Sequence, residues 1–349
     1  MKISFIFRLV TASAALAAAL SLAACSRLGG SSGGIYKDTR VIMGTYITIT
    51  AAGKDLTEEQ AMRAIDAGFA EVTRVDELMS TYKPQSQLSE VNREAGIKPV
   101  KVDPEVIEDT EQALATAKAT DGAFDPTIGP LVRAWKIGSP DARIPSQAEI
   151  DKANKLVDYM QVEVDKNNGT IFLKKKGMSL DLGGVAKGYA TDRAVAAMKK
   201  AGVNSGIVAC AGDIEAFGTR PDGKPWGVGI QHPREKDAIL ARVDLRDAAI
   251  STSGDYERYF IKDGKRYHHI LDARTGYPAQ GLVSVTVIAR KSWLADSMAT
   301  GLFVLGPEKA EALASQRHDI EVLMVDAQGK IFGTGRFAKG FPKAISLEN

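Results

Sequence analysis

The chain passes from an extended segment into a helix at Ser179-Leu180-Asp181-Leu182-Gly183-Gly184-Val185-Ala186-Lys187-Gly188-Tyr189-Ala190. We predict a short strand that ends at Asp181, a turn at the paired glycines, and a helix over residues 186–201. Consecutive glycines before a helix let backbone N–H groups converge on an anion, and the lysine adds a full charge. The spacing matches neither a P-loop nor a G-x-G-x-x-G loop. Phosphate binding and a plain strand–turn–helix junction therefore both stay open.

Helices and strands are interleaved on both sides of this segment. Upstream, we predict one strand over 40–50, a helix over 57–79 with Thr57 as its N-cap, a helix over 106–120, and a hairpin of 159–165 with 169–174. Downstream, we predict strands over 207–211, 226–231, 238–244, 249–252, 256–262 and 283–290, helices over 292–303 and 307–316, and an antiparallel pair of 321–325 with 330–334. No internal repeat occurs, so we expect one α+β domain over 36–347 with largely antiparallel sheet and packed helices.

The overall composition, with 44% hydrophobic and 25% charged residues, is that of a folded globular chain. Lys and Arg number 45, and Asp and Glu number 43. Two of the basic residues, Lys2 and Arg8, lie in the first 24 residues, which contain no acid, so the rest of the chain has no net charge. Nucleic-acid-binding proteins usually show a basic excess, and we therefore expect no nucleic-acid partner.

The N-terminus has the pattern of an exported lipoprotein. An uncharged apolar run over 9–24 ends in Leu22-Ala23-Ala24-Cys25, which matches the bacterial lipobox, and a Gly/Ser-rich stretch follows. We predict a signal peptide over 1–24, and a lipidated Cys25 with a flexible tether over 25–35. The alternative is an ordinary signal peptide with a chance cysteine. If Cys25 carries lipid, Cys210 is the one remaining thiol. It lies in an apolar run, where we expect it to be packed as a small hydrophobic residue.

Three further segments hold candidate chemistry. Asp296 and Thr300 are four residues apart in a predicted helix, so they share a face and offer hard oxygen ligands of the kind that Mg²⁺ prefers. Asp125 lies in a rigid proline-containing loop, and residues 266–278 include two adjacent histidines, His268 and His269. Taken singly, each segment has a structural explanation that is at least as common. The hydroxyl-rich stretch over 251–256 is interpreted as a turn.

Together and in this order, the segments resemble the ApbE family, the FAD:protein FMN transferases. The matching motifs are Met43-Gly44-Thr45, Ser80-Thr81-Tyr82, Ser86-x-Leu88-Ser89-x-x-Asn92, Phe124-Asp125-Pro126-Thr127-x-Gly129-Pro130-Leu131, Asp181-Leu182-Gly183-Gly184-x-Ala186-Lys187-Gly188, Ser251-x-Ser253-Gly254-Asp255-Tyr256, His269-Ile270-Leu271-Asp272-x-Arg274-Thr275-Gly276 and Ala295-Asp296-x-x-Ala299-Thr300. They extend over nearly the whole chain after the N-terminal segment. The chain departs from the family in two places: Ala211-Gly212-Asp213 stands where paired glycines are usual, and Ala273 stands where proline is usual.

The resemblance implies a T-fold-like α+β domain that binds FAD and Mg²⁺. It also implies transfer of FMN from FAD to a threonine hydroxyl of a target flavoprotein, with release of AMP; the family's acceptors are subunits of Rnf-type and Na⁺-translocating quinone-reductase (Nqr) redox pumps. Carried over by motif, Asp296, Thr300 and the backbone carbonyl of Ala186 would hold Mg²⁺, and His269 would be the catalytic base. The FAD site would be lined by Met43, Tyr82, Phe124, Asp125, Asp181 and Lys187.

Two other functions stay open. The same site would act as a Mg²⁺-dependent FAD pyrophosphatase if water replaced the acceptor hydroxyl, although Tyr82 favours the transferase. A non-catalytic, lipid-anchored flavin-binding protein is the second alternative, but such a protein needs no base like His269. We expect the lipid anchor to hold the protein on the periplasmic side of the inner membrane, and Ser26 leaves outer-membrane sorting open.

Overall fold

The computed structural model describes residues 34–338, which are built around one eight-stranded sheet. Every pairing in this sheet is antiparallel. Its strands, in spatial order, are β1 (Gly34–Ile42), β2 (Thr45–Gly53), β6 (Gly206–Cys210), β7 (Asp213–Phe217), β10 (Ala248–Gly254), β15 (Leu282–Ala289), β16 (Ile320–Asp326) and β17 (Ile331–Gly333). The predicted α+β class with a largely antiparallel sheet is confirmed.

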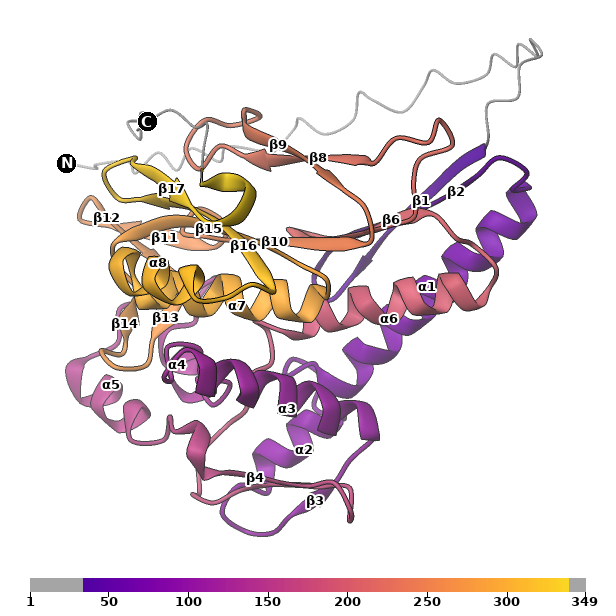
Figure 1. Ribbon diagram of the computed structural model, residues 1–349. Coiled ribbons are helices and arrows are strands. Elements are labelled where there is room, and N and C mark those ends of the chain that lie inside the picture. The colour runs from indigo at the N-terminus through magenta and orange to yellow at the C-terminus, as the bar shows by residue number, and fades with distance from the viewer. Residues whose placement is uncertain (1–33, 339–349) are drawn as a thin grey trace, which may run out of the picture. The chain divides into compact units, whose positions relative to one another are not determined.

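The other elements lie on the two faces of this sheet or beyond its helical layer (Figure 1). The helices are α1 (Glu58–Met79), α2 (Gln87–Arg93), α3 (Pro104–Ala119), α4 (Gly129–Trp135), α5 (Gln147–Asn154), α6 (Ala186–Lys200), α7 (Ser292–Leu305) and α8 (Pro307–Ser315). The smaller sheets comprise β3 (Val100–Lys101), β5 (Thr170–Leu173) and β4 (Val162–Asp165), then β8 (Trp226–Gln231) with β9 (Ile239–Leu245), β11 (Tyr259–Lys262) with β12 (Lys265–His268), and β13 (Leu271–Asp272) with β14 (Tyr277–Pro278).

Helices α1, α6 and α7 cover one face of the large sheet, and the β8–β9 hairpin covers the other (Figure 1). Successive side chains of β16 point to opposite faces of the sheet, so this one strand packs against both layers. Val322 and Met324 belong to the apolar cluster that includes α7 and α8, whereas Leu323 and Val325 pack with the strands of the β8–β9 hairpin. The sheet is therefore buried on both faces, and the site described below lies under its helical face.

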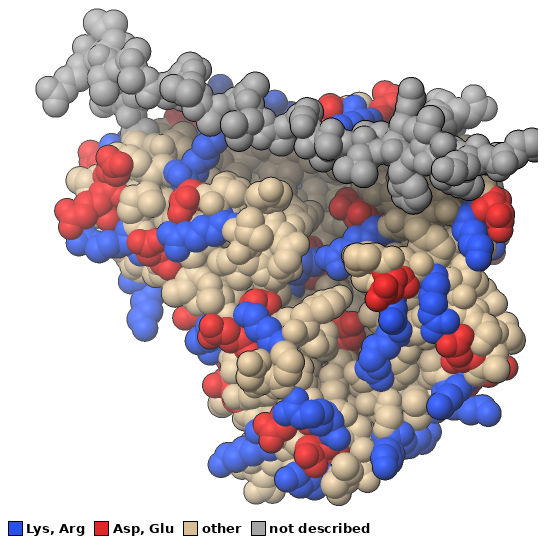
Figure 2. Space-filling model, turned by 180° about the vertical axis from the view of Figure 1, so that it is seen from behind, with Lys and Arg blue, Asp and Glu red and all other residues tan. Residues whose placement is uncertain are grey.

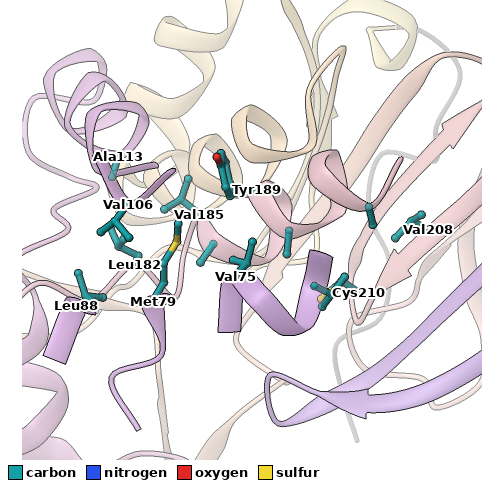
Figure 3. Close-up of a cluster of buried hydrophobic side chains, with 14 of the residues drawn as sticks. Val75, Met79, Leu88, Val106, Ala113, Leu182, Val185, Tyr189, Val208 and Cys210 are labelled. Carbon is teal, nitrogen blue, oxygen red and sulfur yellow. The ribbon is translucent and has the colours of Figure 1, made fainter. Parts of the chain in front are cut away.

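Apolar side chains of the loop that precedes α6 are buried in the largest core cluster and fix this loop in place. Leu182 and Val185 are buried on either side of the paired glycines, and Figure 3 shows them beside Val106 of α3 and Met79 of α1. Cys210, the free thiol at the end of β6, is buried in the same cluster, as predicted. Burial raises the pKa of its thiol to about 12, so it stays protonated and unreactive at neutral pH.

Several element boundaries agree with the sequence predictions. Thr57 caps α1 through a full capping box with Gln60, and α6, α7 and α8 begin at the predicted residues. The predicted antiparallel pair at the C-terminal side is β16 with β17 at the edge of the sheet. Strand β1 begins at Gly34, so two residues assigned to the tether are paired in the sheet.

Three predictions of secondary structure are wrong. The single strand over 40–50 is a hairpin, because Met43 (φ 54°) and Gly44 (φ 67°) form a two-residue turn between β1 and β2. The stretch interpreted as a turn at 251–254 is the end of the central strand β10. The expected strand that ends at Asp181 is extended backbone without a ladder partner, since its hydrogen bonds go to a side chain and a loop.

The signal peptide, Cys25 and residues 26–33 of the tether lie outside the described residues, as do 339–347 of the predicted domain. Within 34–338, no helix is both long and apolar enough to cross a membrane. On the face that Figure 2 shows, basic and acidic side chains of the described residues are interspersed.

Candidate functional site

Contacts from distant parts of the chain hold the loop before α6 in place. The side-chain amide of Asn92 donates to the Leu180 carbonyl (2.9 Å) and its oxygen accepts the Leu180 N–H (2.7 Å), across a separation of 88 residues. The N–H of Asp181 donates to the Pro126 carbonyl at 2.7 Å. Three of the motifs quoted above, those around Asn92, Pro126 and Asp181, therefore meet in one place. This immobilises the two glycines that lead into α6.

Helices α6 and α7 cap each other with carboxylates. Val185 at the start of α6 supplies no side-chain cap, but Asp296 of α7 accepts the N–H of Gly188 through Oδ2 at 3.1 Å. Asp192 of α6 in turn accepts the N–H of Trp293 at 3.0 Å. The reciprocal arrangement places the Asp296 carboxylate at the positive end of α6. The first turn of α6, which begins at Ala186, is consequently hydrogen-bonded to Asp296 through Gly188.

Lys187 lies between two buried carboxylates, Asp213 and Asp296. Its ammonium forms a short ion pair with Asp213 Oδ2, while both oxygens of Asp296 are 3.5 Å away. Asp213 and Asp296 are 1% and 3% exposed, so two negative charges and one positive charge are enclosed together. Burial and the neighbouring Asp213 raise the pKa of Asp296 to about 7, despite the opposing effect of Lys187.

Hydroxyl groups from the adjacent strand complete this cluster. Ser251 of β10 donates to Asp213 Oδ1, and Ser253, two residues further on, contacts Thr300 Oγ1 of α7 at 3.1 Å. Because side chains two residues apart share a face of a strand, both hydroxyls point toward α7. The structure thus brings together Lys187, Asp296 and Thr300, which the sequence predicted, with Asp213 and the two serines.

The donor set fits a hard divalent cation. Asp296 and Thr300 offer a carboxylate and a hydroxyl from one face of α7, and Ala186 offers a backbone carbonyl in the turn of α6 whose Gly188 N–H bonds Asp296. A Cβ placed on Gly184 would come within 3.5 Å of Thr300 Oγ1 and 3.0 Å of the Phe124 ring. Because glycine has no Cβ, this space beside the Thr300 hydroxyl stays open. Among residues 34–338 no three His, Cys, Asp or Glu side chains form a metal cluster, so water or phosphate oxygens would complete the ligand shell of such a cation.

Two predicted site carboxylates have different surroundings. Asp125 accepts hydrogen bonds from the N–H and hydroxyl of Thr127 (2.8 and 2.6 Å) and from the Tyr159 N–H (3.1 Å), so its oxygens fix its own loop. Asp181 uses Oδ1 to accept the Gly183 N–H at 2.9 Å. Burial raises the pKa of both carboxyls, and for Asp181 the charges of two arginines, Arg258 and Arg133, oppose that effect.

His269 follows β12 directly and has a neutral imidazole. Burial and the positive charge of Arg258 lower its pKa to about 3. Its Nδ1 lies 3.3 Å from the Arg258 carbonyl, which only accepts hydrogen bonds, so Nδ1 holds the proton and Nε2 keeps its lone pair. A neutral imidazole with Nε2 available is the form that a general base requires.

The adjacent His268 is buried in the core instead. Its Nε2 lies 2.9 Å from the Ala279 carbonyl, and its ring packs edge-on against Phe303. Asp272 and Arg274 of the same motif also have a structural role. Arg274 forms a bidentate ion pair with Asp272 and donates a hydrogen bond to the Val304 carbonyl at the end of α7. The turn over residues 272–276 forms although Ala273 stands in the usual proline position. The Gly276 N–H closes it by donating to the Asp272 carbonyl at 2.7 Å.

Met43 and Tyr82 occupy more peripheral positions. Met43 is in the β1–β2 turn and packs partly on the main core cluster. Tyr82 follows α1 and is 82% exposed. Neither side chain forms a hydrogen bond or ion pair with Lys187, Asp296 or His269, so the structure does not join them to the charged cluster as it joins Asp213.

Asp213, Ser251 and Ser253 are the site residues that the sequence did not assign. In the sequence, Asp213 stands out only as part of the unusual Ala211-Gly212-Asp213 segment, and the two serines lie in the stretch that we interpret as a turn. Ser251 and Ser253 follow the apolar residues Ala249 and Ile250, and a strand continued through residue 253 would have placed both hydroxyls on one face.

Comparison with known proteins agrees with this fold and identifies the family. The ApbE family pattern matches residues 43–324. The chain is 34% identical over 349 residues to the FAD:protein FMN transferase of Escherichia coli K12, with 96% of each chain covered. Its fold is similar to the ApbE protein of Thermotoga maritima (TM-score 0.81, 34% identity, 88% of this chain and 100% of that one) and to the flavin transferase ApbE of Vibrio cholerae (TM-score 0.78, 28% identity, 87% and 98%). From its sequence, its fold and the place of its motifs, the chain belongs to the ApbE family.

Proposed function

We propose that this protein is an FAD:protein FMN transferase that moves FMN from FAD to a threonine hydroxyl of a target flavoprotein, with Mg²⁺ as its cofactor and AMP as the leaving group. The transferase activity is that of the relatives to which the chain is similar over nearly their whole length. The observation that supports it most is the enclosed Lys187–Asp213–Asp296 cluster beside the start of α6, with a neutral His269 in the same region.

The chain's own residues divide the work between binding and proton transfer. The Lys187 ammonium and the N-terminus of α6 attract the pyrophosphate of FAD. Asp296, Thr300 and the Ala186 carbonyl would hold Mg²⁺, which supplies charge neutralisation on the phosphates when bound. Phe124 and Asp181 lie beside the paired glycines, where they would contact the nucleotide.

His269 would act on the acceptor. Its Nε2 takes the proton of the threonine hydroxyl as the oxygen bonds to the FMN phosphorus, and the phosphoanhydride bond to AMP breaks. A threonine hydroxyl is a weak nucleophile without such a base. With its pKa lowered to about 3, the imidazole is unprotonated at physiological pH, so the Nε2 lone pair is free, while the same lowering makes His269 a weaker base than an exposed histidine.

The acceptor that we propose is a subunit of an Rnf-type or Nqr-type redox pump in the inner membrane. A lipid on Cys25 would hold the enzyme on the periplasmic side of that membrane. Replacing Cys25 with Ser should abolish labelling by radioactive palmitate. A Cys25→Ser protein that is labelled like the wild type would contradict the anchor.

The activity is tested with residues 26–349, FAD, Mg²⁺ and a purified acceptor domain, by mass spectrometry of the acceptor. We expect a mass gain of one FMN, which the His269→Ala and Asp296→Ala variants lose. His318→Ala is the matched control, because His318 is an exposed histidine outside the site. Free FMN and AMP with unmodified acceptor would indicate a pyrophosphatase, and bound, intact FAD would indicate a carrier.

A further inference from the structure

The orientation of Asp213 is fixed by donors from two different elements. It begins β7 and is 1% exposed. Its Oδ2 accepts the Lys187 ammonium of α6, and its Oδ1 accepts the Ser251 hydroxyl of β10. Both oxygens of Asp213 therefore already accept a hydrogen bond. Neither oxygen is hydrogen-bonded to Thr300, which lies beside Gly184.

Lys187 is held unequally between its two carboxylate neighbours. The ammonium is in close contact with Asp213 but 3.5 Å from each oxygen of Asp296. Asp296 Oδ2 also receives the Gly188 N–H at 3.1 Å, whereas Oδ1 has no shorter polar contact recorded than Lys187. Among the described residues, Asp296 is the one other carboxylate within 4.0 Å of the Lys187 ammonium.

We propose that Asp213 is a positioning residue that draws the Lys187 ammonium away from Asp296 and thereby keeps the Asp296 carboxylate free to bind Mg²⁺. The inference rests on the proposed function, which puts Mg²⁺ at Asp296. An ammonium and a divalent cation compete for the same carboxylate in an enclosed site, where charge interactions are strong. Without the Asp213 charge, Lys187 would pair with Asp296 and become a built-in competitor of the metal.

The test measures metal affinity rather than activity. Metal-free protein is titrated with Mg²⁺ by calorimetry and with Mn²⁺ by electron paramagnetic resonance, for the wild type, Asp213→Asn, Lys187→Met and the double variant. Asp213→Asn should weaken binding of both ions about tenfold or more, since its Lys187 neutralises Asp296. Lys187→Met should bind at least as tightly as the wild type.

The double variant decides between positioning and direct ligation. If Asp213 acts through Lys187, removing both groups leaves Asp296 without a competitor, and the affinity returns to within about threefold of the wild type. If the double variant binds as weakly as Asp213→Asn, then Asp213 is itself a ligand and the inference is wrong. Unchanged affinity in Asp213→Asn also overturns it.

A second variant changes no charge. Ser251→Ala removes the hydroxyl that orients Asp213 and should weaken Mg²⁺ binding about threefold, the value of one lost hydrogen bond. Thr252→Ala is its matched control, because the Thr252 hydroxyl bonds Thr286 at 2.8 Å and does not contact Asp213. Equal affinities in the two variants would contradict the positioning role. This pair decides the question if Asp213→Asn does not fold, which circular dichroism will show.

Asp296→Asn separates this inference from the proposed function. If its loss of Mg²⁺ affinity is large while Asp213→Asn binds normally, only the positioning role fails. If Asp296→Asn binds Mg²⁺ like the wild type, the proposed metal site fails and the inference fails with it.

Discussion

Two clusters of charged side chains in this protein differ in whether their charges balance. Asp272 and Arg274 form a complete pair, with two hydrogen bonds at 2.8 Å between the side chains and a third, also 2.8 Å, from Arg274 to the Val304 carbonyl. The other cluster encloses two carboxylates, Asp213 and Asp296, around the single ammonium of Lys187. The balanced pair joins a turn to the end of α7, whereas the unbalanced cluster has a deficit of positive charge that a cation would fill.

The largest effect should come from the unbalanced cluster. Asp296→Asn keeps the shape of the side chain but removes the charge that would hold Mg²⁺, so FMN transfer should fall by about 10³-fold, as expected for several kcal/mol of lost transition-state stabilisation. Mass spectrometry of the acceptor over time measures the rate. Retention of more than a tenth of wild-type activity would mean that this cluster is structural, like its counterpart.

The balanced cluster should respond in stability and not in activity. Asp272→Asn breaks the pair with Arg274, whose side chain is 42% exposed, so the free energy of unfolding should decrease by about 2 kcal/mol or less. Urea denaturation measures this change. The transfer rate per folded molecule should stay within about twofold of the wild type. A large loss of that rate in folded protein would move Asp272 into the site.

A pH titration should separate the clusters further. The pKa of Asp296 is raised to about 7, and only its ionised form binds a cation, so Mg²⁺ affinity should fall about tenfold for each pH unit below 7. The folded protein keeps this proton between about pH 4 and 7 while the unfolded chain releases it, so Asp296 makes the metal-free protein less stable as pH rises through that range. Calorimetry with Mg²⁺ and thermal unfolding without it, each from pH 5 to 8, measure the two trends. An affinity that is flat from pH 6 to 8 would contradict the raised pKa.

The smallest expected effect is a change in the free energy of unfolding, caused by a substitution in a turn next to one of these clusters. The turn of the balanced cluster has Gly276 at φ 74°, where a Cβ would clash with Ile150, but the β6–β7 turn beside Asp213 has Ala211 at φ 53°. A left-handed conformation is unfavourable for alanine, so Ala211→Gly should increase the free energy of unfolding by about 0.5–1 kcal/mol after the entropy cost of glycine. Urea denaturation would detect it. A decrease would show that the turn holds no strain.

Local sequence signals predicted the elements that depend on local physics. The apolar spacing of α1 and its Thr57 cap gave correct bounds, because a helix satisfies its own backbone and needs only one buried face. The hairpin turn at Met43 and the C-terminal end of strand β10 were missed for the opposite reason. A two-residue turn barely interrupts the alternation, and the hydroxyls of Ser251 and Ser253 resemble turn chemistry until their partners on other elements are known.

The sequence by itself determined the family, the α+β class, and the four-residue spacing that puts Asp296 and Thr300 on one helix face. Only the tertiary structure decided that Asp213 joins Lys187, that Asn92 clamps the loop 88 residues away, and that burial beside Arg258 keeps His269 neutral. The physical reason is that spacing along a helix is a local property, whereas desolvation and charge balance are sums over neighbours that the chain brings together only when it folds.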